Sequence, residues 1–146
     1  MHLGDCLRFK AKVVNGPKKG LALVTEPLSF LGDVDKQTGV ILSDRSSARG
    51  YSIANKILIM KTSRGSTVGA YVIYSLCKNK VAPQAIVLGT LDSVVASGVL
   101  LCSSVGLAFV LDLSFFEIVK SGDIVHIGGD VVEVCKKGSP SSYRGN

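Results

Sequence analysis

The chain has 146 residues, of which 47% are hydrophobic and only 19% charged, and it carries a formal net charge of +6. This length suits one domain that buries a core without help from disulfides or metals. The apolar runs fall far short of a membrane span and the start has no signal-peptide pattern, so we expect a cytoplasmic protein without membrane contact. The chain has no Trp and only 6% aromatic residues, so its excess of Lys and Arg has few aromatic side chains beside it on which bases could stack. This composition argues against a nucleic-acid-binding surface.

The cysteines are far apart in the sequence. They are Cys6, Cys77, Cys102 and Cys135. Because an intracellular chain keeps its thiols reduced, we expect buried structural cysteines in preference to disulfides or ligands. With His2 at the terminus and His126 in an expected strand, no spacing typical of a metal site is present.

Short strands and turns make up the first third of the chain. Residues 8–13 alternate basic and apolar side chains, the period of a half-buried strand with a solvated face, and residues 21–24 form a second strand. The two could form a hairpin or lie further apart. Residues 26–39 have breakers at both ends and predict a long loop that carries Leu28, Phe30 and Leu31 inward. A third strand is expected over residues 40–42.

From residue 53 the pattern changes to β-α-β units, followed by a hairpin with a glycine turn. Strands are expected over 57–60, 85–88 and 107–111, helices over 67–78 and 91–101, and hairpin strands over 124–127 and 131–134. Phe115 and Phe116 are expected in the core. The fold class is therefore α/β, with a single domain over 1–135 and a disordered tail over 136–146.

The loop between the strand at 57–60 and the next helix predicts an anion site. Gly65 permits a sharp turn, Ser66 or Thr67 can cap the helix, and the free N–H groups of the first turn would lie beside the guanidinium of Arg64. Such a site can hold a carboxylate or phosphate and lower the pKa of a nearby hydroxyl. The alternative is that the hydroxyls do no more than cap the helix. Neither common nucleotide-loop motif fits.

Three segments in order resemble the small subunit or swivel domain of the aconitase X family. They are residues 23–35 (Leu-Val-Thr-Glu-Pro-Leu-Ser-Phe-Leu-Gly-Asp-Val-Asp), residues 53–58 running into Arg64-Gly65-Ser66-Thr67, and residues 82–87 (Ala-Pro-Gln-Ala-Ile-Val). Together they cover roughly residues 20 to 105. The chain departs from the commoner bacterial wording of the loop at Ser63, Thr67, Val68 and Ala70.

The resemblance implies a swivelling β/β/α domain that closes over a large subunit holding an iron-sulfur cluster, with no cofactor or metal bound by this chain. It implies that Ser66 is the acid-base residue of a dehydration, and that Arg64, Gly65, Thr67 and Ser29 bind a small anionic substrate. The cluster iron would act as a Lewis acid on the departing hydroxyl.

Three functions remain open at this point. The resemblance implies a heterodimeric hydro-lyase acting on mevalonate 5-phosphate, giving the trans-anhydro acid in an archaeal isoprenoid pathway. It is also compatible with a related dehydratase acting on a cyclic, hydroxyproline-like amino acid. The third is a non-catalytic interaction module that shares the swivel fold.

Overall fold

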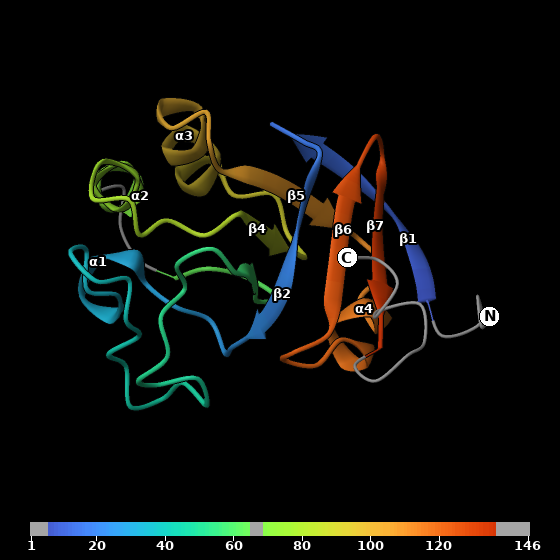
Figure 1. Cartoon of the computed structure of the whole chain (residues 1–146), viewed down its shortest axis with the longest axis horizontal. Coiled ribbons are helices and arrows are strands. Elements are labelled where there is room, and N and C mark those ends of the chain that lie inside the picture. Colours follow the sequence, from blue (N-terminus) through green and yellow to red (C-terminus); the bar gives the residue numbers. More distant parts are fainter. Residues whose placement is uncertain (1–5, 65–68, 137–146) are drawn as a thin grey trace.

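The computed structural model describes residues 6–64 and 69–136, and their strands close into a barrel (Figure 1). The strands are β1 (Cys6–Val14), β2 (Lys18–Val24), β3 (Ile57–Ile59), β4 (Ala85–Leu88), β5 (Gly106–Val110), β6 (Ile124–Gly128) and β7 (Val131–Cys135). Their order around the barrel is β1-β5-β4-β3-β2-β6-β7. The pairs β2-β3, β3-β4 and β4-β5 are parallel, whereas the remaining pairs are antiparallel.

The helices lie mainly on one side of the parallel strands. They are α1 (Phe30–Asp33), α2 (Gly69–Lys78), α3 (Ser93–Leu101) and α4 (Ser114–Ile118). Helices α2 and α3 lie on the same side of the barrel in Figure 1 and pack against each other. Gly98 makes this close approach possible, since a Cβ there would lie 2.8 Å from Cβ of Ile73.

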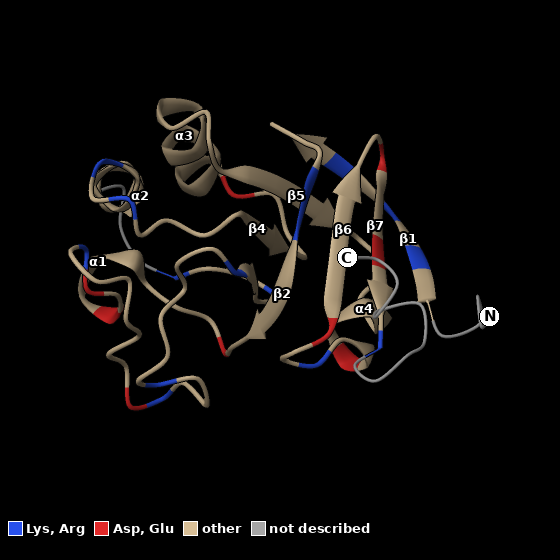
Figure 2. Cartoon of the chain, viewed as in Figure 1, with Lys and Arg blue, Asp and Glu red and all other residues tan. Residues whose placement is uncertain are grey.

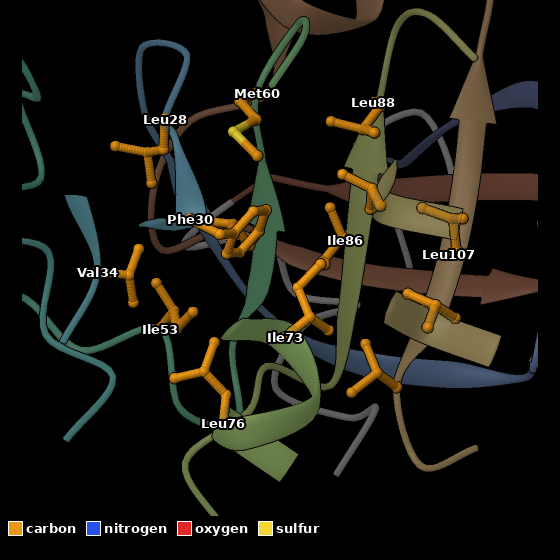
Figure 3. Close-up of a cluster of buried hydrophobic side chains, with 14 of the residues drawn as sticks. Leu28, Phe30, Val34, Ile53, Met60, Ile73, Leu76, Ile86, Leu88 and Leu107 are labelled. Atoms are coloured by element: carbon orange, nitrogen blue, oxygen red, sulfur yellow. The ribbon is translucent and has the colours of Figure 1, made fainter. Parts of the chain in front are cut away.

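Two apolar clusters stabilise this arrangement, one under the helices and one inside the barrel. The first includes Phe30 from α1, Ile73 from α2 and Ile86 from β4 (Figure 3). The second is formed by alternate residues of the same strands, such as Val87, together with Phe115 of α4. Because both faces are covered, every residue of β3, β4 and β5 is buried, as is typical of parallel strands.

Most of the expected elements are confirmed with small changes in their bounds, and the α/β class is confirmed. The basic residues of β1 are exposed while Ala11 between them is buried, as the alternation predicted. The hairpin is confirmed as β6 and β7, with Gly129 in its turn at a φ of 60°. Strands β1 and β2 lie apart, since β1 pairs with β5 and β7, and β2 with β3 and β6.

Several expectations for individual segments are wrong. Residues 40–42 make only isolated bridges, to Val34 and Ser52, because their neighbours on both sides are turns and not strands. Leu31 is 50% exposed, whereas Leu28 and Phe30 are buried as expected. Phe116 is only partly buried, and both phenylalanines belong to a short helix that was not anticipated. The expected disordered tail lies outside the described residues, apart from residue 136.

The expectation of reduced cysteines is also wrong, because the fold pairs all four. Cys6 and Cys135 are register partners on β1 and β7, with Cα atoms 4.0 Å apart, and form one disulfide. Cys77 in α2 and Cys102 at the end of α3 form the other, with Cα atoms 6.3 Å apart. The paired cysteines are 129 and 25 residues apart in the sequence, so no local pattern indicates either disulfide. Strand pairing brings one pair together, and helix packing brings the other together.

Within the described ranges, none of the helices has the length and apolar character needed to cross a bilayer.

Candidate functional site

The predicted anion loop follows β3, where the parallel strands β2, β3 and β4 all end at one edge of the sheet. Ligands in sheets of this kind bind at the carboxyl ends of the strands. Gly65, Ser66 and Thr67 lie outside the described residues, so their placement stays a prediction. The structure describes both flanks of the loop, Arg64 on one side and Gly69 on the other.

Arg64 is brought to Ser29, another predicted substrate-binding residue, by main-chain contacts. The N–H of Arg64 donates to the carbonyl oxygen of Leu28 over 2.8 Å, and Ser29 and Arg64 form an isolated parallel bridge. The Arg64 side chain is exposed. This pairing explains how two segments far apart in the sequence meet beside the loop, and it leaves the guanidinium accessible to an anion.

Ser29 is itself held in place by α1. Its N–H donates to Oδ2 of Asp33 over 2.8 Å, and its hydroxyl donates to the carbonyl oxygen of Leu31 over 3.0 Å. The hydroxyl oxygen keeps free lone pairs that can accept a hydrogen bond. Ser29 is therefore fixed by its main chain beside Arg64, with its hydroxyl proton already engaged.

Asp92 connects the loop to α3 and is a residue whose role the sequence revealed only in part. One carboxylate oxygen caps α3 by accepting from the N–H groups of Val94 and Val95, at 2.9 and 3.0 Å. The other accepts from the hydroxyl of Ser63 over 2.5 Å. The cap could be expected from the residue type just before an apolar segment. The bond to Ser63 could not, because no local pattern joins residues 29 positions apart.

On the far side of the loop, Gly69 lies between α1 and α3. A Cβ at this position would lie 3.4 Å from Cγ1 of Val94 and 3.8 Å from Cβ of Phe30. The start of α2 is therefore packed tightly between two other elements. The helix dipole places partial positive charge at this end of α2, directly after the loop.

A cavity of about 370 Å³ lies at the carboxyl ends of β2 and β3, next to the start of the loop. Met60 and Phe116 contribute apolar walls, and Lys61 contributes an exposed cation. The N–H of Ser47 donates to Oε1 of Glu26 over 2.7 Å, and the Ser47 hydroxyl donates to the same oxygen. The N–H bond above all lowers the pKa of Glu26 from its ordinary value of 4.5, so this wall of the cavity is anionic at neutral pH.

The described residues do not offer a cluster or metal site. In residues 6–64 and 69–136, no group of three or more His, Cys, Asp or Glu side chains could hold a metal ion. The cysteine sulfurs are paired with each other. The residues that the structure describes therefore do not fit the iron-sulfur cluster that the resemblance implies for the complete enzyme.

Comparison with known proteins decides the family. A profile described as "Aconitase X swivel domain" matches residues 8–134. The chain belongs to the aconitase X swivel-domain family. The resemblance inferred from the three segments is thereby confirmed, and with it the swivel-domain fold class.

Curated relatives of the swivel domain align over most of both chains. The phosphomevalonate dehydratase small subunit of Thermococcus gammatolerans is 44% identical over 124 residues, covering 84% of this chain and 92% of the relative. The protein of the same name from Methanosarcina mazei is 37% identical over 136 residues, covering 90% and 94%.

The solved structure of Thermococcus kodakaraensis aconitase X in its holo-form resembles this swivel domain closely. Its TM-score is 0.81 at 39% identity, with 89% of this chain and 99% of that chain covered.

Proposed function

We propose that this chain is the small subunit of a phosphomevalonate dehydratase, a hydro-lyase that acts together with a large subunit. The observation that carries the proposal is the near full-length match to relatives of that name, at 44% identity to the Thermococcus gammatolerans protein and 37% to the Methanosarcina mazei protein. The reaction converts mevalonate 5-phosphate into trans-anhydromevalonate 5-phosphate and water. The placement of Arg64 and Ser29 at the carboxyl ends of the strands supports it.

The chemistry assigns a separate task to each residue of the loop. A base takes a proton from the carbon next to the carboxylate, hydroxide leaves the neighbouring carbon, and a carbon–carbon double bond forms between them. In the proposal Ser66 is that base, and it works as an alkoxide. Its pKa must be lowered by positive potential, which Arg64 and the N-terminal end of α2 supply.

Substrate binding is assigned to the groups around Ser66. The exposed guanidinium of Arg64 suits a bidentate grip on the substrate carboxylate. In the proposal the main-chain N–H groups of Gly65 and Thr67 bind the same anion. The Ser29 hydroxyl already donates its proton to the Leu31 carbonyl oxygen. In the proposal its oxygen therefore accepts a hydrogen bond from a substrate hydroxyl.

The iron-sulfur cluster is assigned to the large subunit, since the described residues of this chain offer no ligand set for it. The small subunit expressed alone should be colourless and inactive. A co-expressed pair should be brown and sensitive to oxygen. An isolated small subunit that bound a cluster stoichiometrically would contradict this assignment.

The substrate is tested by assaying the reconstituted pair on mevalonate 5-phosphate and on a hydroxyproline-like amino acid. We expect turnover of the phosphate ester alone. Turnover of the amino acid alone would show that the chain belongs to the related dehydratase that acts on a hydroxyproline-like substrate. A stable pair that turns over neither compound would favour a non-catalytic interaction module.

The role of Ser66 is tested by Ser66→Ala in the pair. Turnover should fall by at least ~100-fold, the scale on which general acid-base help contributes. Ser97→Ala is a suitable control, because Ser97 is exposed on α3 and its hydroxyl donates to the carbonyl oxygen of Ser93 within the same helix. Arg64→Lys should raise KM as well as lower kcat, because an ammonium cannot grip a carboxylate in bidentate fashion. A Ser66→Ala pair that kept most of its activity would return the serine to a capping role.

A further inference from the structure

The barrel closes along only half of β1. Residues 11–14 pair with β5 on one side of the strand, whereas residues 6–10 pair with β7 on the other side. β5 ends at Val110, the register partner of Ala11. The first half of β1 therefore has a neighbouring strand on its β7 side alone.

The hydrogen-bond pattern shows which main-chain groups face the open side of β1. In an antiparallel ladder a residue directs its N–H and C=O to the same neighbour, and successive residues alternate between the two sides. The N–H of Ala11 donates to the carbonyl oxygen of Asp130, just before β7, over 2.8 Å. Arg8 and Lys10 therefore direct their N–H groups away from β7, to the side on which β5 has ended. Among the described residues, these two N–H groups have no main-chain acceptor there.

A groove of about 880 Å³ borders this open side. Its lining includes Lys12 of β1 and Phe109 of β5, which are register partners, and Leu111, which follows the end of β5 and is 69% exposed. Arg8 and Lys10 line the groove as well. The open main-chain groups thus lie beside a space that is hollow and partly apolar.

Three exposed cations follow β1 at every second residue. They are Arg8, Lys10 and Lys12, visible among the blue segments of β1 in Figure 2. Residues two apart in a strand point to the same face and lie about 7 Å apart along it. The carboxylates in the lining, of Asp112 and Asp130, come from the segments after β5 and before β7. Positive charge therefore predominates along the strand itself.

We propose that the open side of β1 binds an extended segment of a partner protein, in which acidic residues alternate with apolar ones. The segment adds a strand to β1, and its main chain satisfies the N–H groups of Arg8 and Lys10. Residues directly opposite each other in paired strands point to the same face. The acidic side chains therefore lie beside the cations, and the apolar side chains point to the face of Phe9, which packs edge-on against Phe115.

The cations favour an acidic partner over a second copy of this chain. Pairing two β1 strands through their open sides would bring their basic side chains together, and like charges opposite each other destabilise a sheet. Natural edge strands use Lys in this way to prevent association with their own kind. β1 and α2 lie on opposite sides of the molecule in Figure 1. The bound segment therefore lies away from the loop that precedes α2.

The first experiment measures binding of the full-length chain to the synthetic peptide acetyl-Glu-Val-Glu-Val-Glu-Val-Glu-amide by titration calorimetry. Arg8→Glu and Lys10→Glu should each weaken binding by at least ~10-fold, because each sets like charges opposite each other. Lys36→Glu is the matched control and should bind as wild type does. Lys36 is an exposed lysine whose carbonyl oxygen accepts from Asn79, just after α2. Thermal unfolding checks that the three variants fold, since exposed substitutions alter stability little.

Two modified peptides separate strand addition from charge attraction alone. In the added strand the glutamates lie opposite Arg8 and Lys10 and direct their N–H groups to β1, whereas the valines direct theirs away. N-methylation of the glutamate nitrogens should therefore abolish binding. N-methylation of the valine nitrogens leaves the charge of the peptide unchanged and should leave binding intact.

The outcomes that overturn the proposal are distinct from one another. Wild type that does not bind the acidic peptide at about 1 mM has no docking site for it. Equal binding of both N-methylated peptides shows an attraction of charges that does not use the main chain of β1. Equal binding of a Lys-Val-Lys-Val-Lys-Val-Lys peptide excludes the cations as the source of selectivity. Self-association of wild type that Lys10→Glu abolishes assigns the open side to a contact between copies of this chain.

Discussion

Asp92 is the described residue whose removal should report most directly on how the loop is anchored. Asp92→Ala deletes the two bonds that cap α3, worth about 1 kcal/mol together, as is usual for an N-cap. It also deletes the acceptor of the Ser63 hydroxyl, which at a half-buried charged bond is worth about 1 kcal/mol more. We expect Asp92→Ala to lower the free energy of unfolding by about 2 kcal/mol, or Tm by about 6 °C for a chain of this size.

A double-mutant cycle with Ser63 isolates the contribution of the hydrogen bond between Ser63 and Asp92. Ser63→Ala removes only that bond and should cost about 1 kcal/mol, or about 3 °C in Tm. The double variant should be no less stable than Asp92→Ala, because the bond is already lost, which gives a coupling of about 1 kcal/mol. Asp92→Asn should lose less than Asp92→Ala, since Asn caps helices equally well. Urea or thermal unfolding with both disulfides intact measures the stability of wild type and of all four variants. Losses that simply add, to about 3 kcal/mol in the double variant, would refute the anchor.

Three further predictions concern the frame that supports the site. Replacing Cys6 and Cys135 together by Ser should lower the free energy of unfolding by about 2–5 kcal/mol under non-reducing conditions. The reason is that the disulfide, whose cysteines are 129 residues apart, no longer closes a loop in the unfolded chain, which gains conformational entropy. Urea midpoints equal to wild type would contradict this. Lys136→Met should cost about 3 kcal/mol, because it leaves the buried carboxylate of Asp123 without the ammonium that lies 2.7 Å away; restoration of wild-type stability by adding Asp123→Asn checks the cause. Glu26→Gln should lose less than about 1 kcal/mol at pH 7. The lowered pKa of Glu26 contributes stability above pH 4.5 that is lost as the pH falls through the folded-state pKa, so wild type and Glu26→Gln should converge in acid.

The sequence by itself determined the elements whose burial repeats locally. The alternation in β1 gave a strand with one wet face, and the apolar run at residues 85–88 gave a strand covered on both faces, with the bounds that β4 has. Asp92, a residue type that favours helix N-caps, caps α3. These features depend on side chains within a few residues of each other, and such spacing can be read directly from the chain. The three family segments added the loop and the roles expected of its residues, and those roles stay predictions.

Only the tertiary structure decided which distant residues meet. The pairing of β1 with both β5 and β7 closes the barrel, and that pairing sets Cys6 opposite Cys135. The packing of α2 on α3 likewise joins Cys77 to Cys102. The short α1 turns Phe30 into the core and leaves Leu31 in solvent, although both are large and apolar. Strand order and helix packing depend on the free energy of burying whole faces against each other, so no short stretch of sequence contains the information that fixes these contacts.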